Sequence, residues 1–217
     1  MKTQSTLWQW LFLALLFPFL QSCDDDEDPA WAGGYIPQTI SLQVDFLNKR
    51  GDDLVSPLST VRVPQGAGND ADKDVVTLAP ATYLLEVYLD GKLVDSSQHQ
   101  QWVICQVSDS PLNEGYKTLL LYSTEVEKQI MASKQYWHSH VIEYHFTCQA
   151  LFNDDQKHVV RYDFMPPSPE TSVFDYQGAV SLDGQALQVF YPNGPIYAGQ
   201  PQHAQGLGLA VEAVIAY

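Results

Sequence analysis

Hydrophobic and polar residues alternate along much of the chain, as they do in β-strands that bury one face. Over residues 40–46, Ile, Leu, Val and Phe take every second position, and Ser, Gln and Asp fill the positions between them. Shorter apolar segments with the same tendency recur throughout the chain. The pattern predicts strands at 40–46, 54–63, 75–78, 83–89, 92–95, 102–107, 116–122, 141–152, 158–164, 179–182, 185–191 and 207–217.

Turn-forming residues separate several of these segments. Asp90-Gly91 and Asp183-Gly184 each stand between two short strands, and this dipeptide favours a type I′ hairpin turn. The acidic turn 153–155 lies between segments 141–152 and 158–164. We therefore expect those two segments to pair as a hairpin.

One helix is expected among the strands. Thr124 and Glu127 match a capping box with Thr124 as the N-cap, and Val126 and Ile130 share a face before the helix ends near Ser133. Many short strands with one helical connection predict an all-β fold. We expect an antiparallel β-sandwich, either immunoglobulin-like or transthyretin-like, with one short helix.

The first residues of the chain follow a different pattern. Met1 and Lys2 precede an apolar segment, 7–20, of about 14 residues, whereas a bilayer-spanning helix needs about 20. A basic start and a short apolar core predict a secretory signal peptide. Leu20-Gln21-Ser22-Cys23 resembles a bacterial lipobox, although Gln21 and Ser22 depart from its commoner residues. The resemblance implies cleavage before Cys23 and lipidation of that cysteine.

An acidic segment, Asp24 to Asp28, follows the cysteine directly. So many adjacent negative charges cannot pack, which predicts a solvated tether. The segment resembles the acidic export tag of Bacteroidota surface lipoproteins, which implies an outer-membrane lipoprotein displayed at the cell surface. The periplasmic face is the alternative, and in enterobacteria an Asp here implies inner-membrane retention. We expect a signal peptide over 1–22, a lipidated tether over 23–34 and a single β-sandwich domain over 35–217.

The charge balance narrows the set of expected partners. The chain holds 26 Asp and Glu against 11 Lys and Arg, a formal net charge of −15. Nucleic-acid binding depends on neutralising phosphates, so this balance excludes nucleic acid as a partner. The phosphate-cradling glycine loop and the common nucleophile and zinc-protease motifs are missing from the sequence. We therefore expect no cofactor and favour a non-enzymatic role, without deciding against an enzyme.

Cys105 and Cys148 fall in expected strands and remain available after Cys23 takes lipid. In an exported protein such a pair can form a disulfide, which would stabilise the fold by about 4 kcal/mol on the chain-entropy model. The alternative is a pair of buried free thiols that pack as small hydrophobes. Both states remain open at this point.

His138 and His140 are the sharpest candidates for chemistry. Residues two apart on a strand point to the same face, so both imidazoles could reach one metal ion. The alternative is that two histidines at a strand entrance are solvated or hydrogen-bonded.

Four aromatic residues are candidates for a ligand surface. Exposed aromatic rings stack on sugar rings or on other proteins, whereas buried ones pack in the core. The surface candidates are Tyr136, Trp137, Tyr191 and Tyr197.

These observations favour a lipid-anchored surface lipoprotein that acts as a non-enzymatic binding or assembly module. Its expected partners are the membrane, through the lipid, and an outer-membrane protein complex or a glycan. One alternative is a glycan-binding surface protein that uses the aromatic residues. A second alternative is a metal-dependent enzyme or metal carrier that uses His138 and His140.

Overall fold

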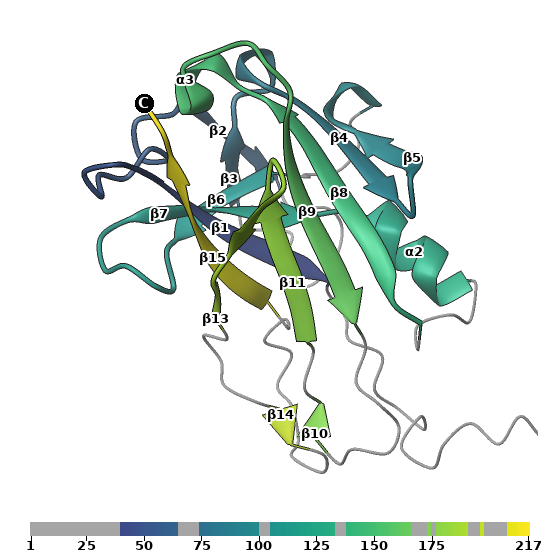
Figure 1. The fold of residues 1–217 in the computed structure, drawn as a ribbon. Helices are drawn as coiled ribbons and strands as arrows, with labels where there is room; N and C mark the ends of the chain where they lie inside the picture. The colour runs from purple at the N-terminus through teal and green to yellow at the C-terminus, as the bar shows by residue number, and fades with distance from the viewer. Residues whose placement is uncertain are drawn as a thin grey trace, which may run out of the picture. The chain divides into compact units, whose positions relative to one another are not determined.

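The alternating segments form two β-sheets that pack face to face in this computed structural model (Figure 1). The structure describes residues 40–64, 74–99, 105–132, 138–165, 173–174, 177–190, 196–197 and 208–217. All of them belong to one compact unit, Pro37–Tyr217. The expected all-β sandwich is thereby confirmed.

The first sheet has seven strands in the order β13-β15-β1-β7-β6-β3-β2. Its pairs are antiparallel except for the pair of β1 and β15, which is parallel and joins the first and last described strands. The strands are β1 Ser41–Asn48, β2 Thr60–Pro64, β3 Asp74–Leu78, β6 Cys105–Asp109, β7 Lys117–Tyr122, β13 Val189–Phe190 and β15 Gly208–Ile215.

The second sheet has six antiparallel strands in the order β12-β11-β9-β8-β4-β5. The expected hairpin of β8 and β9 forms its centre. The strands are β4 Leu84–Leu89, β5 Lys92–Ser96, β8 His140–Thr147, β9 His158–Met165, β11 Gln177–Leu182 and β12 Gln185–Leu187. A separate two-stranded ribbon pairs β10 Val173–Phe174 with β14 Ile196–Tyr197.

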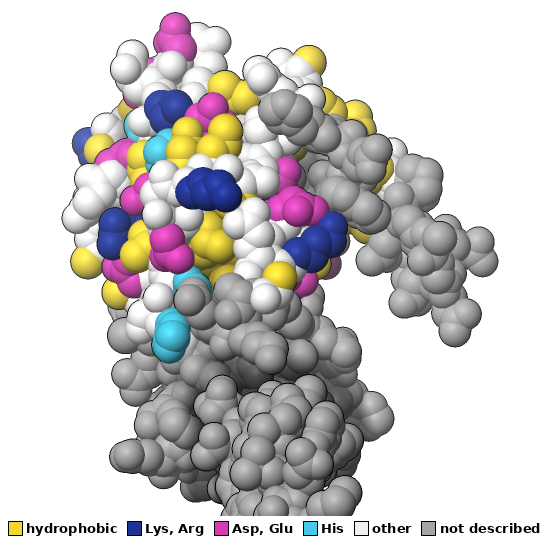
Figure 2. Space-filling model, turned by 90° about the vertical axis from the view of Figure 1, so that its right-hand side faces the viewer, with side chains coloured by type: hydrophobic (Ala, Val, Ile, Leu, Met, Phe, Trp, Pro, Cys, Tyr) yellow, Lys and Arg dark blue, Asp and Glu magenta, His cyan; other side chains and the backbone are white. Residues whose placement is uncertain are grey.

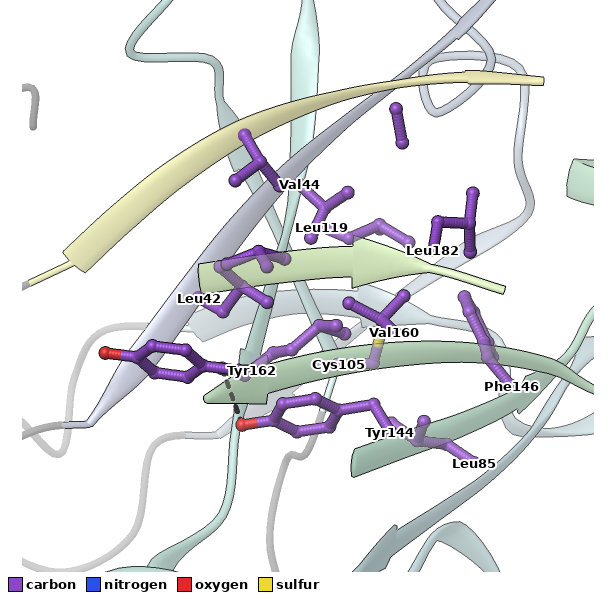
Figure 3. Close-up of a cluster of buried hydrophobic side chains, with 14 of the residues drawn as sticks. Leu42, Val44, Leu85, Cys105, Leu119, Tyr144, Phe146, Val160, Tyr162 and Leu182 are labelled. Carbon is purple, nitrogen blue, oxygen red and sulfur yellow. Dashed lines mark hydrogen bonds between the residues drawn. The ribbon is translucent and has the colours of Figure 1, made fainter. Parts of the chain in front are cut away.

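The core lies between the two sheets and follows the period-two pattern. Along β8, buried and half-buried residues alternate strictly, and along β4 they alternate in the same way. Figure 3 shows side chains of both sheets meeting in this layer: Leu42, Val44, Cys105 and Leu119 from the first, and Leu85, Tyr144, Phe146, Val160, Tyr162 and Leu182 from the second. The hydroxyl of Tyr144 donates to the carbonyl of Leu121 across the core at 3.5 Å.

The expected helix forms as α2, Thr124–Ala132, with the short 3-10 turns η2 Pro80–Thr82 and η3 Ser97–His99 elsewhere in the chain. The N-cap of α2 is Ser123 rather than the expected Thr124, because the Ser123 Oγ accepts a hydrogen bond from the backbone nitrogen of Val126 at 3.4 Å. Thr124 Oγ1 has no hydrogen-bond partner among the described residues. Glu127 is instead held by the Tyr122 hydroxyl and the backbone nitrogen of Ile40, each at 3.0 Å.

Two expected strands are shorter than the pattern suggested. Segment 54–63 pairs only from Thr60, because Pro57 and the bends around it precede the strand. Segment 141–152 ends its strand at Thr147 and continues as the helix α3, Gln149–Phe152, whose Leu151 and Phe152 are still buried. None of the helices in the described part of the chain has the length and apolar character that a membrane crossing requires.

Candidate functional site

A pocket of about 440 Å³ opens where the C-terminal end of β15 meets the β11–β12 turn and α3. Figure 1 shows α3 and the C-terminus at the same end of the sandwich. We call this hollow the end pocket. Its lining comes from four segments and consists of Phe152, Asn153, Asp154, His158, Leu182, Asp183, Gln185, Val214, Ile215, Ala216 and Tyr217.

A hairpin turn places the first polar group of the end pocket. Asp183 and Gly184 adopt φ values of 50° and 80°, as the expected type I′ turn requires. Asp183 exchanges hydrogen bonds with Val159 on the neighbouring strand: its nitrogen donates to the Val159 carbonyl at 2.9 Å, and its Oδ1 accepts from the Val159 nitrogen at 2.8 Å. Its Oδ2 lies 2.7 Å from His158 Nδ1. The turn therefore fixes both the aspartate and the histidine.

His158 is held on three sides. Its Nε2 lies 3.0 Å from Asp154 Oδ1, opposite the contact of Nδ1 with Asp183. Its ring stacks on Phe152 with centroids 3.9 Å apart and an angle of 18° between the planes. Burial alone would lower the pKa of His158, but the hydrogen bonds to Asp183 and Asp154 outweigh it and raise the pKa above the ordinary value. The contact with His158 in turn lowers the pKa of Asp154.

These contacts decide what the end pocket can do chemically. Both ring nitrogens of His158 contact carboxylates, so the imidazole offers no lone pair for proton abstraction or for a metal ion. The rest of the lining combines polar groups such as Asn153 and Gln185 with exposed apolar side chains. Val214 is 57% exposed and Tyr217 is 47% exposed, and the Tyr217 hydroxyl donates to the Leu151 carbonyl at 2.9 Å. A pre-formed hollow of this composition suits binding.

The chain matches no family model. No curated protein and no solved structure matches it either. The arrangement of the described residues therefore carries the functional argument.

The structure places His138 and His140 in different surroundings. His138 lies in a bend before β8 and is exposed. His140 begins β8, turns to the core side with 5% of its side chain exposed, and places Nδ1 2.8 Å from Asp90 Oδ2. Within the described residues, no group of three or more His, Cys, Asp or Glu side chains is placed to share one metal ion. His140 is therefore hydrogen-bonded, which is the alternative to metal binding that the sequence left open.

Cys105 and Cys148 are free, buried thiols in the structure. Cys105 belongs to β6 of the first sheet, and Cys148 directly follows β8 of the second. Burial, with a smaller effect from the nearby Cys148, raises the pKa of Cys105, and burial also raises the pKa of Cys148. The thiolate is the nucleophile, so neither cysteine is activated for nucleophilic chemistry.

Several predicted site residues lie outside the described part of the chain. These are Cys23, Tyr136, Trp137 and Tyr191, together with the side chain of Tyr197, whose backbone belongs to β14. The predictions for these residues stay predictions. Sequence reasoning missed the end pocket, although it singled out both turns that flank it, Asp183-Gly184 and 153–155.

The outer face of the six-stranded sheet carries a second polar group of residues. Glu143 contacts both Arg161 and His145 at 3.3 Å, and His145 stacks on Tyr88 with centroids 4.3 Å apart. Figure 2 views the molecule from the side of β5 and α2 and shows charged and hydrophobic side chains intermingled on that side. Because these charges pair with one another on an open face, we interpret them as ordinary surface ion pairs rather than as a ligand site.

Proposed function

We propose that this protein is a lipid-anchored surface lipoprotein that acts as a non-enzymatic binding module, with the end pocket as its binding site. The main support for this proposal is the end pocket, in which fixed polar groups border exposed apolar side chains. Surface apolar groups beside ordered polar ones are the usual basis of specific binding.

The state of the titratable groups supports binding over catalysis. A general base needs a free nitrogen or oxygen at the reacting position. His158 has both nitrogens engaged by Asp154 and Asp183, and the Cys105 and Cys148 thiols are buried with raised pKa values. The described residues around the end pocket thus favour holding a ligand in place.

The proposed lipid anchor rests on the sequence alone. The lipobox-like Leu20-Gln21-Ser22-Cys23 and the acidic residues after it support lipidation at Cys23 and export to the outer-membrane surface. Metabolic labelling with palmitate tests this directly. We expect label on the wild-type chain and none on Cys23→Ser, and protease treatment of intact cells should degrade the wild-type domain. Equal labelling of both proteins would reject the anchor.

A matched pair of variants tests the binding site. Val214 lies in the end pocket, whereas Leu93 on β5 is a similarly exposed hydrophobic residue outside it. Neither substitution with Asp removes a buried side chain, so both variants should fold. We expect Val214→Asp to lose co-purifying partners from detergent-solubilised membranes and Leu93→Asp to keep them. Equal recovery with both variants would reject the end pocket.

A glycan ligand is the second candidate, and the polar lining of the end pocket favours it. Asn153, Gln185 and Asp154 carry the amide and carboxylate groups that hydrogen-bond sugar hydroxyls, and Tyr217 adds an exposed ring. Retardation in polysaccharide affinity gels should be lost in Tyr217→Ala and retained in Tyr88→Ala, outside the pocket. Loss in Trp137→Ala instead would indicate the separate aromatic platform predicted from sequence.

A further inference from the structure

Two carboxylates lie side by side on the outer face of the seven-stranded sheet, and neither lines the end pocket. Asp45 of β1 and Glu212 of β15 are register partners on neighbouring parallel strands, so their side chains share a face. Asp45 is 1% exposed, although it points away from the core side occupied by Val44 and Phe46. Of the described residues, no Lys, Arg or His forms an ion pair with either carboxylate.

The loop after β6 closes over this pair with neutral groups only. The Ser110 hydroxyl donates to Asp45 Oδ2, and the Asn113 amide nitrogen lies 3.0 Å from the same oxygen and 2.8 Å from Glu212 Oε1. The backbone nitrogens of residues 112 and 113 donate to the Ser110 hydroxyl at 3.0 and 2.9 Å. The loop is therefore held in place, but it brings no positive charge to two adjacent negative ones.

Two oxygens at this place have no hydrogen-bond partner among the described residues: Asp45 Oδ1 and Thr118 Oγ1. Thr118 is 0% exposed. The β1–β7 pairing ends with Val44 opposite Leu119. One step further in the same register Asp45 would stand opposite Thr118, and the period-two alternation of each strand puts both side chains on the face away from the core. Burying an oxygen without a partner costs free energy, and native proteins usually satisfy such groups with water or an ion.

We propose that Asp45, Glu212 and Thr118 hold a calcium ion, with Asn113 as an added ligand. Every atom that these side chains would offer to a metal ion is an oxygen, and oxygen ligands favour hard cations over zinc or copper. Half a turn of the Asn113 amide would present its oxygen where the nitrogen now bridges both carboxylates. Ligands from three strands and a loop suit the irregular geometry of Ca²⁺ better than the strict octahedron of Mg²⁺. With only two carboxylates, the Kd should be on the order of 0.1–1 mM, as in extracellular calcium modules.

Calcium titration of the chelator-treated full-length protein tests the proposal. Wild-type protein should show a saturable rise in Tm and a matching heat of binding, because a ligand that binds only the native state stabilises it. Glu212→Gln should weaken the affinity about tenfold or more, since one of two anionic ligands is lost. The control, Glu143→Gln on the other sheet, should keep the wild-type affinity.

Thr118→Val gives a signature that a nonspecific charge effect would not produce. Removing a buried, unpartnered hydroxyl should raise the Tm without calcium, while the calcium-induced rise in Tm should shrink. Both variants retain Asp45, whose hydrogen bonds to the loop 110–113 support folding. The proposal is overturned if wild-type protein shows no Tm rise at calcium concentrations about tenfold above the expected Kd range. It is equally overturned if Glu212→Gln and Thr118→Val respond as the wild type does.

Discussion

The six-stranded sheet uses the same arrangement at both of its ends, with different surroundings. At one end, the Asp90-Gly91 turn places Asp90 against His140 and Val141, and at the other, Asp183-Gly184 places Asp183 against His158 and Val159. In each case, Oδ1 accepts the valine nitrogen at 2.8 Å and Oδ2 contacts the histidine Nδ1. Both aspartates have a φ of 50°.

The surroundings then separate the two histidines. His140 has 5% of its side chain exposed, whereas His158 is 18% exposed, contacts a second carboxylate in Asp154 and lines the end pocket. A two-residue turn thus suffices to pair an aspartate with a histidine. Whether that pair borders a binding site depends on α3 and β15, which reach only one end of the sheet.

Removing each aspartate in turn should give the largest difference in unfolding free energy between the two ends of the sheet. Asp90→Ala leaves Nδ1 of a nearly buried histidine without this carboxylate, and should cost about 2–3 kcal/mol of unfolding free energy. Asp183→Ala should cost about 1–2 kcal/mol, because water and Asp154 can compensate at His158. Chemical denaturation measures both values. Asp→Asn at each position, which keeps the turn, serves as control, and a larger cost at Asp183 would contradict the comparison.

Replacing the glycine of either turn should lower the unfolding free energy by the same amount. Gly91 and Gly184 have φ values of 78° and 80°, and a Cβ at either would meet nothing within 4 Å. Substitution with Ala therefore costs only the backbone strain of the left-handed region, about 1–2 kcal/mol at each site. Denaturation of Gly91→Ala and Gly184→Ala should give equal losses. A clear inequality would show that the two turns differ in more than their surroundings.

The pH dependence of stability should single out His158. Because its folded pKa is raised, its stabilising contribution is complete below the unfolded value of about 6.5 and is lost as pH rises through the folded pKa. The unfolding free energy should therefore fall as the pH rises above about 6.5, and His158→Gln should flatten that fall. An unchanged slope in His158→Gln would contradict the role of the two aspartates.

Asp154→Asn should have the smallest effect on stability, because 43% of the Asp154 side chain is exposed. It should nevertheless lower the pKa of His158, since one of the two carboxylates that raise it is gone. NMR titration of the His158 ring protons measures this shift.

Local patterns predicted much of this fold. Period-two alternation located most strands, and the Asp-Gly dipeptides located two hairpins, because side-chain direction and turn geometry depend on neighbouring residues. The parallel pairing of β1 with β15 was not predictable, since partner choice depends on contacts between distant segments. Segment 149–152 was mistaken for strand because its buried Leu151 and Phe152 fit either structure.

The candidate site was less accessible to sequence reasoning. The end pocket draws its lining from four segments, so no single motif contains it. His138 and His140 looked like a metal pair by spacing, but the strand begins at His140 and leaves His138 before it. Likewise, Asp45 and Glu212 become neighbours only through the parallel pairing of the first and last described strands.

Site-specific photocrosslinking on intact membranes shows whether a partner contacts the end pocket. A photoreactive phenylalanine analogue replaces Val214 in the end pocket or, as control, Leu93 on β5, both of which are exposed. The account predicts a discrete crosslinked product at position 214 and none at position 93. Equal crosslinking at both positions, or crosslinking at position 93 alone, would contradict the assignment of the end pocket as the binding site.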